Sequence, residues 1–261
     1  MGDFMKNVII GVIALLLIVL GGFYMKKYKS SEETTGQIQQ VKWQLHDMDI
    51  NEIANITFQL QNKKGAEIRG VNDHIRMFIV DRQLTQSYEA RPTFVGDGSY
   101  KATYQFKKEG EYTIFLYEET GDTTKQFAEK NIVAGKKVVE KKQNPIAADT
   151  VLTKSIGPYK TSLLFRTLYP NEEETLTFQF QVGKGQKVKF RSNAGERSEL
   201  RIVDGERQHF LYVVPNNNEE QLQFRVTFPS EGLYKIWGTF YIDGKKYEEQ
   251  FTLQVQKRKD S

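Results

Sequence analysis

The two halves of the chain carry the same sequence pattern. Three blocks recur in the same order, and residues 56–61, 79–81 and 106–114 match residues 176–181, 202–204 and 228–236. The offset between matching blocks stays between 120 and 123 residues. Chance similarity does not keep order and spacing over three blocks, so the chain contains a duplicated domain and not a short-period solenoid.

Length and composition allow both copies to fold. A chain of 261 residues has room for two domains of ordinary size. Its 39% of hydrophobic and 12% of aromatic residues supply two cores and exclude disorder throughout the chain. We expect the first domain at residues 41–135, a charged linker at residues 136–149, the second domain at residues 150–256 and a basic tail at residues 257–261.

Each copy alternates apolar and polar residues with the period of a β-strand. Tyr100, Ala102 and Phe106 share one face of such a strand, and the dipeptides at residues 97–98 and 243–244 are Asp-Gly hairpin signals. Short strands at this spacing predict an all-β fold, with two tandem Ig-like β-sandwich domains. The repeated Glu-Gly-x-Tyr motif predicts that Tyr112 and Tyr234 form the structural corner of such a domain.

The N-terminal segment predicts a membrane anchor. After a flank at residues 1–6, residues 8–25 carry no charge, and this length spans a bilayer as a helix. We expect a transmembrane signal-anchor helix at residues 7–25 and a polar tether at residues 26–40. A cleaved signal peptide is the alternative, but no small-residue cleavage motif follows the apolar run.

Charges on the two sides of this helix leave its orientation open. The basic residues Lys26, Lys27 and Lys29 follow the helix, and the positive-inside rule alone would place them in the cytoplasm. We nevertheless expect a single-pass protein of the cell membrane with the bulk of the chain outside, because domains of this type are usually extracytoplasmic.

The composition excludes several functional classes. There is no cysteine, hence no disulfide, thiolate metal site or cysteine nucleophile. The net charge of +4 is spread along the chain and does not indicate nucleic-acid binding, although weak attraction to anionic lipid or wall polymer is compatible with it. No nucleophile elbow, P-loop or dinucleotide fingerprint is present, so we expect neither an enzyme nor a cofactor.

Several motifs resemble a known family. The first copy has a histidine motif at residues 74–76, a hydrophobic strand ending in Val-Asp at residues 78–81 and a Gly-Asp-Gly turn at residues 96–98, and the second ends its unit with Phe-Pro and Gly-Leu-Tyr at residues 228–234. This pattern resembles the YtkA-like family of bacterial extracytoplasmic Ig-like domains associated with copper handling. The resemblance covers residues 50–120 and 174–255.

The histidines that the resemblance implies are mostly replaced in this chain. Seven of the implied positions hold Arg76, Glu89, Arg91, Arg197, Glu199, Tyr212 and Val214. His74 alone remains, and one imidazole cannot hold copper or zinc, which take about three or four ligands. The metal role of the family is therefore not carried over.

A weaker metal alternative uses His46, Met48 and His74. His46 and Met48 lie beside acidic residues, and a Cu(I) or zinc site can be imagined there. The more ordinary interpretation is polar surface for His46, His74 and His209 alike.

Two aromatic residues at equivalent positions of the repeat suggest a contact surface. Phe115 and Trp237 point away from the faces that carry Tyr112 and Tyr234. They predict a domain–domain or partner contact, unless they cap the sandwich edge. Together these patterns predict a membrane-anchored, non-catalytic extracytoplasmic binding or scaffolding protein of the bacterial cell envelope, with an envelope protein as its partner. The alternative is a degenerate extracytoplasmic copper- or metal-handling protein.

Overall fold

The structure is a computed structural model that describes most of the chain after residue 37. It describes residues 38, 40–46, 48–68, 74–120, 123–136, 146–183, 188–190, 196–216 and 221–258. These residues form sixteen strands and no helix, and none of them belongs to a helix that could cross a bilayer. The predicted flank, the predicted anchor at residues 7–25 and nearly all of the predicted tether lie outside the described residues.

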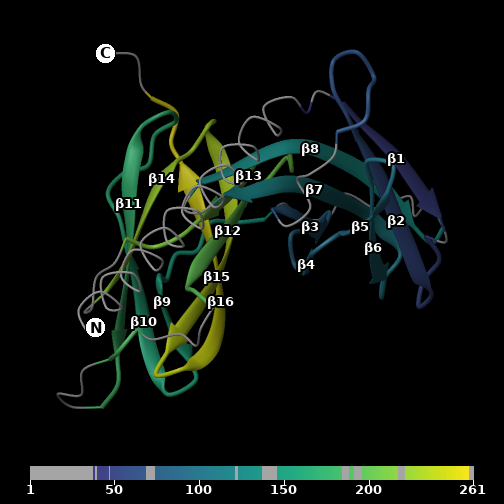
Figure 1. Ribbon diagram of the computed structural model, residues 1–261. Coiled ribbons are helices and arrows are strands. Elements are labelled where there is room, and N and C mark those ends of the chain that lie inside the picture. Colours follow the sequence, from purple (N-terminus) through teal and green to yellow (C-terminus); the bar gives the residue numbers. More distant parts are fainter. Residues whose placement is uncertain are drawn as a thin grey trace, which may run out of the picture.

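The first half of the chain forms two four-stranded antiparallel sheets (Figure 1). One sheet has the order β1 (Gln40–His46), β2 (Ile53–Gln61), β6 (Ser99–Gln105) and β5 (Thr93–Gly96). The other has the order β4 (Ser87–Ala90), β3 (Ile75–Asp81), β7 (Gly110–Thr120) and β8 (Thr123–Ala134).

The second half repeats this arrangement. One sheet has the order β14 (Leu222–Thr227), β11 (Glu173–Gln181), β10 (Tyr159–Leu164) and β9 (Thr153–Ile156). The other has the order β13 (Phe210–Val213), β12 (Glu199–Asp204), β15 (Gly232–Ile242) and β16 (Lys245–Val255).

The strand register shows which strands of the two copies correspond. Phe58 of β2 lies opposite Tyr100 of β6, and its equivalent Phe178 of β11 lies opposite Leu222 of β14. The sheet β4-β3-β7-β8 corresponds in the same way to β13-β12-β15-β16. The copies differ at both edges of the other sheet, because the first adds β5 beyond β6 while the second adds β9 beyond β10, the equivalent of β1.

Each sandwich has its own hydrophobic core. The inward-facing residues of both sheets form one buried cluster in the first half and a separate one in the second. Phe58 stacks on Tyr100 with ring centroids 5.5 Å apart, and Phe178 packs against Phe240 at 4.9 Å. Alternation along the strands places these rings inside, which confirms the all-β prediction.

The predicted hairpin turns are confirmed by their backbone angles. Asp97 and Gly98 both have positive φ, at 48° and 66°, and so do Asp243 and Gly244, at 51° and 74°. A tight primed turn requires this conformation at both central residues. These turns join β5 to β6 and β15 to β16.

The domain boundaries need a small revision at the N-terminal side. Ile38, which lies within the predicted tether, is buried in the core of the first sandwich, and β1 begins at Gln40. The side chain is apolar and its burial stabilises the sandwich, so the packed domain extends into the predicted tether. The last strand ends at Val255.

Candidate functional site

The outer faces of two equivalent sheets pack against each other at the junction of the sandwiches. Along β7, Tyr112, Ile114 and Leu116 point into the core of their own sandwich, whereas Phe115 and Tyr117 point outward. A third buried cluster, which we call the junction cluster, joins such outward residues of both halves. It contains Phe78, Val80, Leu84, Phe115, Tyr117, Val203, Phe210 and Trp237.

Phe210 lies at the centre of the junction cluster. Its ring is 5.0 Å from that of Phe78, 5.7 Å from that of Phe115 and 4.7 Å from that of Tyr117. The rings of Trp237 and Phe78 pack in a T-shaped arrangement, with their centroids 5.5 Å apart. Interlocked aromatic rings of this kind are typical of the buried core of a protein–protein interface.

Phe115 and Trp237 therefore belong to a contact between the two sandwiches. Phe115 is fully buried and Trp237 is 7% exposed. The sequence suggested either a domain–domain contact or a partner contact for these two residues, and in the described part of the chain they form the domain–domain contact. In this arrangement neither ring is open to an external partner.

A network of charged and hydroxyl groups surrounds the junction cluster. Arg201 of β12 forms ion pairs with Glu89 of the other sandwich and with Glu199 of its own strand. The hydroxyl of Tyr117 donates to Glu89 Oε1 at 2.9 Å, and that of Tyr212 donates to Glu199. We call this set, together with the groups around Glu119, the junction network.

Glu119 is the second point at which the junction network crosses between the domains. Arg76 Nε of the first sandwich lies 3.0 Å from Glu119 Oε2, and Arg197 of the second forms an ion pair with Glu119 Oε1. The hydroxyl oxygen of Tyr212, whose proton goes to Glu199, also lies 3.3 Å from this oxygen. Three cationic and three anionic side chains thus neutralise one another across the junction.

Burial shifts the pKa values of the junction network. Desolvation raises the pKa of Glu199, against the opposing effect of Arg201. Desolvation also raises the pKa of the Tyr117 and Tyr212 hydroxyls, with further increases from Glu89 and from Glu199. Desolvation acts to lower the pKa of Arg201, but Glu199 and Glu89 outweigh it and raise that pKa. The tyrosines therefore stay neutral donors, and Arg201 stays a cation.

Sequence reasoning missed this network, although it had singled out most of its members. Arg76, Glu89, Arg197, Glu199 and Tyr212 occupy positions at which the family resemblance implied histidines. Arg76 and Glu199 are equivalent in the repeat and have opposite charges, which was the one available signal of an ion-paired interface between copies. This charge difference does not predict an interface until it is known which sheet faces of the two sandwiches contact each other.

One side of the junction is closed by direct contact between edge strands. Gln126 of β8 accepts a hydrogen bond from the amide of Phe210 at 2.7 Å and donates one to the carbonyl of Gln208 at 3.4 Å. Figure 1 shows β7 and β8 arching from the first sandwich toward β12 and β13 of the second.

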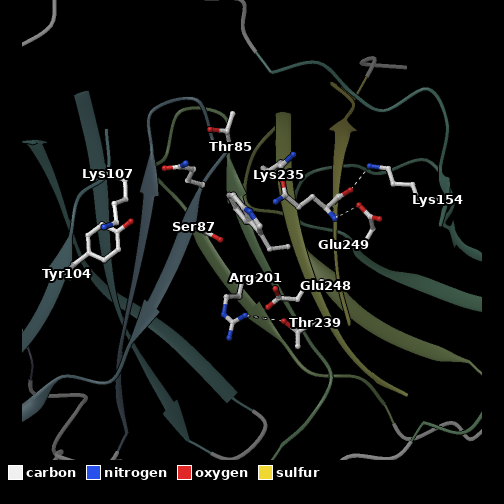
Figure 2. A pocket seen from close by; sticks show the side chains of 14 residues that line it. Thr85, Ser87, Tyr104, Lys107, Lys154, Arg201, Lys235, Thr239, Glu248 and Glu249 are labelled. Atoms are coloured by element: carbon white, nitrogen blue, oxygen red, sulfur yellow. Dashed lines mark hydrogen bonds between the residues drawn. The ribbon is translucent and has the colours of Figure 1, made fainter. Parts of the chain in front are cut away.

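The opposite side of the junction is open. A cleft of about 750 Å³ lies there between β4 and β16, lined by residues of both sandwiches. Figure 2 shows Tyr104 and Lys107 on one side of this cleft, Lys235, Glu249 and Lys154 on the other, and Thr85 and Ser87 between them.

Some of the cations that line the cleft form ion pairs with carboxylates, and others do not. Lys154 lies 2.9 Å from Asp149, and Arg201 belongs to the junction network. Lys235 forms no ion pair with any residue that the structure describes, and desolvation lowers its pKa. Lys107 is exposed and donates to the side chain of Gln105.

Tyr112 and Tyr234 lie at equivalent corners of the two sandwiches. The hydroxyl of Tyr112 donates to the carbonyl of Lys108 at 2.9 Å, and that of Tyr234 donates to the carbonyl of Ser230 at 3.0 Å. Each bond spans four residues back along the chain, which is the geometry of an Ig-like tyrosine corner. Desolvation raises the pKa of Tyr112 to about 12.

The three residues of the weaker metal alternative do not form a metal site within the described part of the chain. His46 is exposed at the end of β1, Met48 packs against the first core, and His74 Nδ1 lies 3.1 Å from the carbonyl oxygen of Glu119. Across the described ranges, no three histidine, aspartate or glutamate side chains gather as metal ligands would.

Comparisons with known proteins match the second sandwich to a family. A family model described as a domain of unknown function (DUF8832) matches residues 154–257, which contain nearly all of β9 to β16. No curated protein matches the chain.

Several solved structures are similar to most of the chain. The Escherichia coli adhesin FdeC is 14% identical over 84% of this chain, with a TM-score of 0.29, and the chain spans 65% of that structure. A two-domain fibronectin type III segment of chicken tenascin is 13% identical, with 82% and 97% of the two chains covered and a TM-score of 0.24. A biofilm-associated protein domain is 16% identical over 84% of this chain and 30% of its own, with a TM-score of 0.25.

Proposed function

We propose that this chain is a membrane-anchored, non-catalytic binding and scaffolding protein of the bacterial cell envelope, in which two Ig-like sandwiches act as one unit outside the membrane. The observation that carries the proposal is the junction. It combines a buried aromatic cluster with ion pairs around it, as stable interfaces do.

A fixed junction suits a scaffold better than a flexible tandem. If the two sandwiches keep one relative orientation, a partner meets a surface that is already arranged and loses little ordering entropy on binding. The proposed N-terminal anchor holds this surface near the membrane and raises its effective concentration for partners there.

The chemistry of the junction also supports a non-catalytic role. Glu89, Glu119 and Glu199 are all engaged by arginines, and the tyrosine hydroxyls donate to these carboxylates. A general base needs a free lone pair that faces a substrate. These groups are instead used to hold the two domains together.

The absence of cysteine makes the proposed topology directly testable. Lys160→Cys places one thiol on an exposed residue of β10. In intact cells we expect a membrane-impermeant maleimide to label this variant fully, because the sandwich would lie outside. Asp3→Cys, before the proposed anchor, is the matched control and should react only after the membrane is permeabilised. Labelling of Asp3→Cys but not Lys160→Cys in intact cells would overturn the proposed location.

A further inference from the structure

The cleft between β4 and β16 is the open counterpart of the closed contact between β8 and β13. By the strand register, Ser87 corresponds to Phe210, Thr85 to Gln208 and Glu248 to Gln126. On the closed side Gln126 bonds directly to the backbone of residues 208–210. On the open side Thr85, Ser87 and Glu248 line the cleft.

The edge of β4 offers backbone hydrogen bonds to this cleft. The amide of Asp81 donates to the carbonyl of Gln86, so these two residues form a hydrogen-bonded pair of the antiparallel ladder. The next pair, Val80 and Ser87, is therefore not hydrogen-bonded, and the amide of Ser87 points away from β3. Its equivalent, the amide of Phe210, is the group that Gln126 binds. An extended peptide can pair with such an edge.

The charge of the cleft favours an occupant with few negative charges. Two lining cations, Lys154 and Arg201, already have carboxylate partners, which leaves Lys107 and Lys235. Glu248 and Glu249 also line the cleft, and Glu248 is paired with Lys246 at 2.6 Å. These carboxylates would repel a polyphosphate chain, but they tolerate a peptide with one or two acidic side chains.

We propose that this cleft binds an extended, acidic segment of a partner protein, with its backbone along the edge of β4, one acidic side chain at Lys235 and another at Lys107. Lys235 is half-buried and unpaired among the described residues, so an incoming carboxylate compensates a cation whose burial is otherwise unfavourable. The inference names the partner chemistry for the proposed scaffold and rests on that function.

The test measures binding of a fluorescein-labelled octapeptide, Thr-Gln-Thr-Glu-Thr-Glu-Thr-Gln, to the full chain in nanodiscs by fluorescence anisotropy, so the probe carries two acidic side chains. A (Thr-Gln)₄ peptide is the uncharged control. We expect the acidic peptide to bind and the neutral one to bind at least about 10-fold more weakly, because charge-assisted hydrogen bonds are the stronger ones.

Variants of the cleft separate the two kinds of contact. Lys235→Gln should weaken binding about 10-fold and Lys107→Gln about 3-fold, since the first cation is half-buried and the second is exposed. Ser87→Pro removes the outward amide without removing a ladder bond and should weaken binding about 5-fold, whereas Ser87→Ala keeps the amide and should not. Lys42→Gln and Lys160→Gln change exposed lysines away from the cleft and should bind like the unaltered chain.

Three results would overturn the inference. They are equal binding of the two peptides, unchanged binding by both Lys235→Gln and Ser87→Pro, and binding of inorganic polyphosphate in place of the peptide. If thiol labelling still places residue 160 outside the membrane, the scaffold proposal survives any of these results and only the acidic partner is excluded.

Discussion

At the scale of single residues, Arg201 decides whether the junction is favourable. Its side chain is 12% exposed and that of Glu199 is 13% exposed, so both charges have lost most of their water. Buried ions are tolerated when they compensate one another, and removing one partner leaves the other charge uncompensated. Arg201 serves Glu199 and Glu89 at once, and no substitute within its own strand is available.

Arg201→Met should lower the free energy of unfolding by about 3 kcal/mol at neutral pH, because two largely buried carboxylates lose their cation. The pKa of Glu199, already raised by desolvation, should rise further without Arg201. Between the ordinary value of 4.5 and this raised value, the folded state binds more protons than the unfolded state, so its stability increases as pH falls.

The deficit of Arg201→Met should therefore shrink when urea unfolding is repeated from pH 8 down to pH 5. Arg225→Met, at an exposed position of β14, is the matched control and should change stability by less than about 0.5 kcal/mol at every pH. An Arg201→Met variant as stable as the control at neutral pH would show that the junction network contributes nothing.

At the scale of strands and turns, the repeated corner supports each sandwich separately. Tyr112→Phe and Tyr234→Phe each remove a hydroxyl that satisfies a backbone carbonyl. We expect each to lower the free energy of unfolding by about 1–2 kcal/mol, because the carbonyl loses its partner without gaining water freely. Tyr88→Phe, on a side chain that is 40% exposed, is the control. Equal urea midpoints for all three variants would contradict the structural role of the corner.

Much of each sandwich could be predicted from the sequence because strands repeat every two residues. The alternation of Leu222, Phe224, Val226 and Phe228 reports directly which face is buried. Outward-facing residues carry no such signal: Phe115 and Trp237 fit a domain contact, a partner contact or an edge cap equally well from sequence. The burial of Ile38 could not be predicted, because one apolar residue in a polar stretch shows no periodicity.

The network and the cleft could not be predicted for a related reason. Glu89 and Arg201 are separated by 112 residues, and their pairing depends on how two folded units are placed. No pattern within one copy encodes that placement. The two edges of the junction differ in their structure although their sequences derive from one repeat, and only the three-dimensional arrangement shows which edge stays open.

At the scale of the whole molecule, the cleft and the proposed scaffold both require the two sandwiches to keep one relative orientation. The junction cluster supplies the apolar part of this contact, with Ile146 of the predicted linker packed against it, and the junction network supplies its specificity. A tandem joined by a linker alone would sample many orientations and would have no lasting cleft between β4 and β16.

The most direct test is the distribution of distances between spin labels on the two sandwiches, measured by pulsed electron paramagnetic resonance. The chain has no cysteine, so Lys42→Cys and Lys160→Cys place one label on an exposed residue of each domain. In the full chain in nanodiscs we predict one narrow distribution, which broadens when Phe210→Ala removes the central ring of the junction cluster. A broad distribution before that substitution, unchanged by it, would contradict the account.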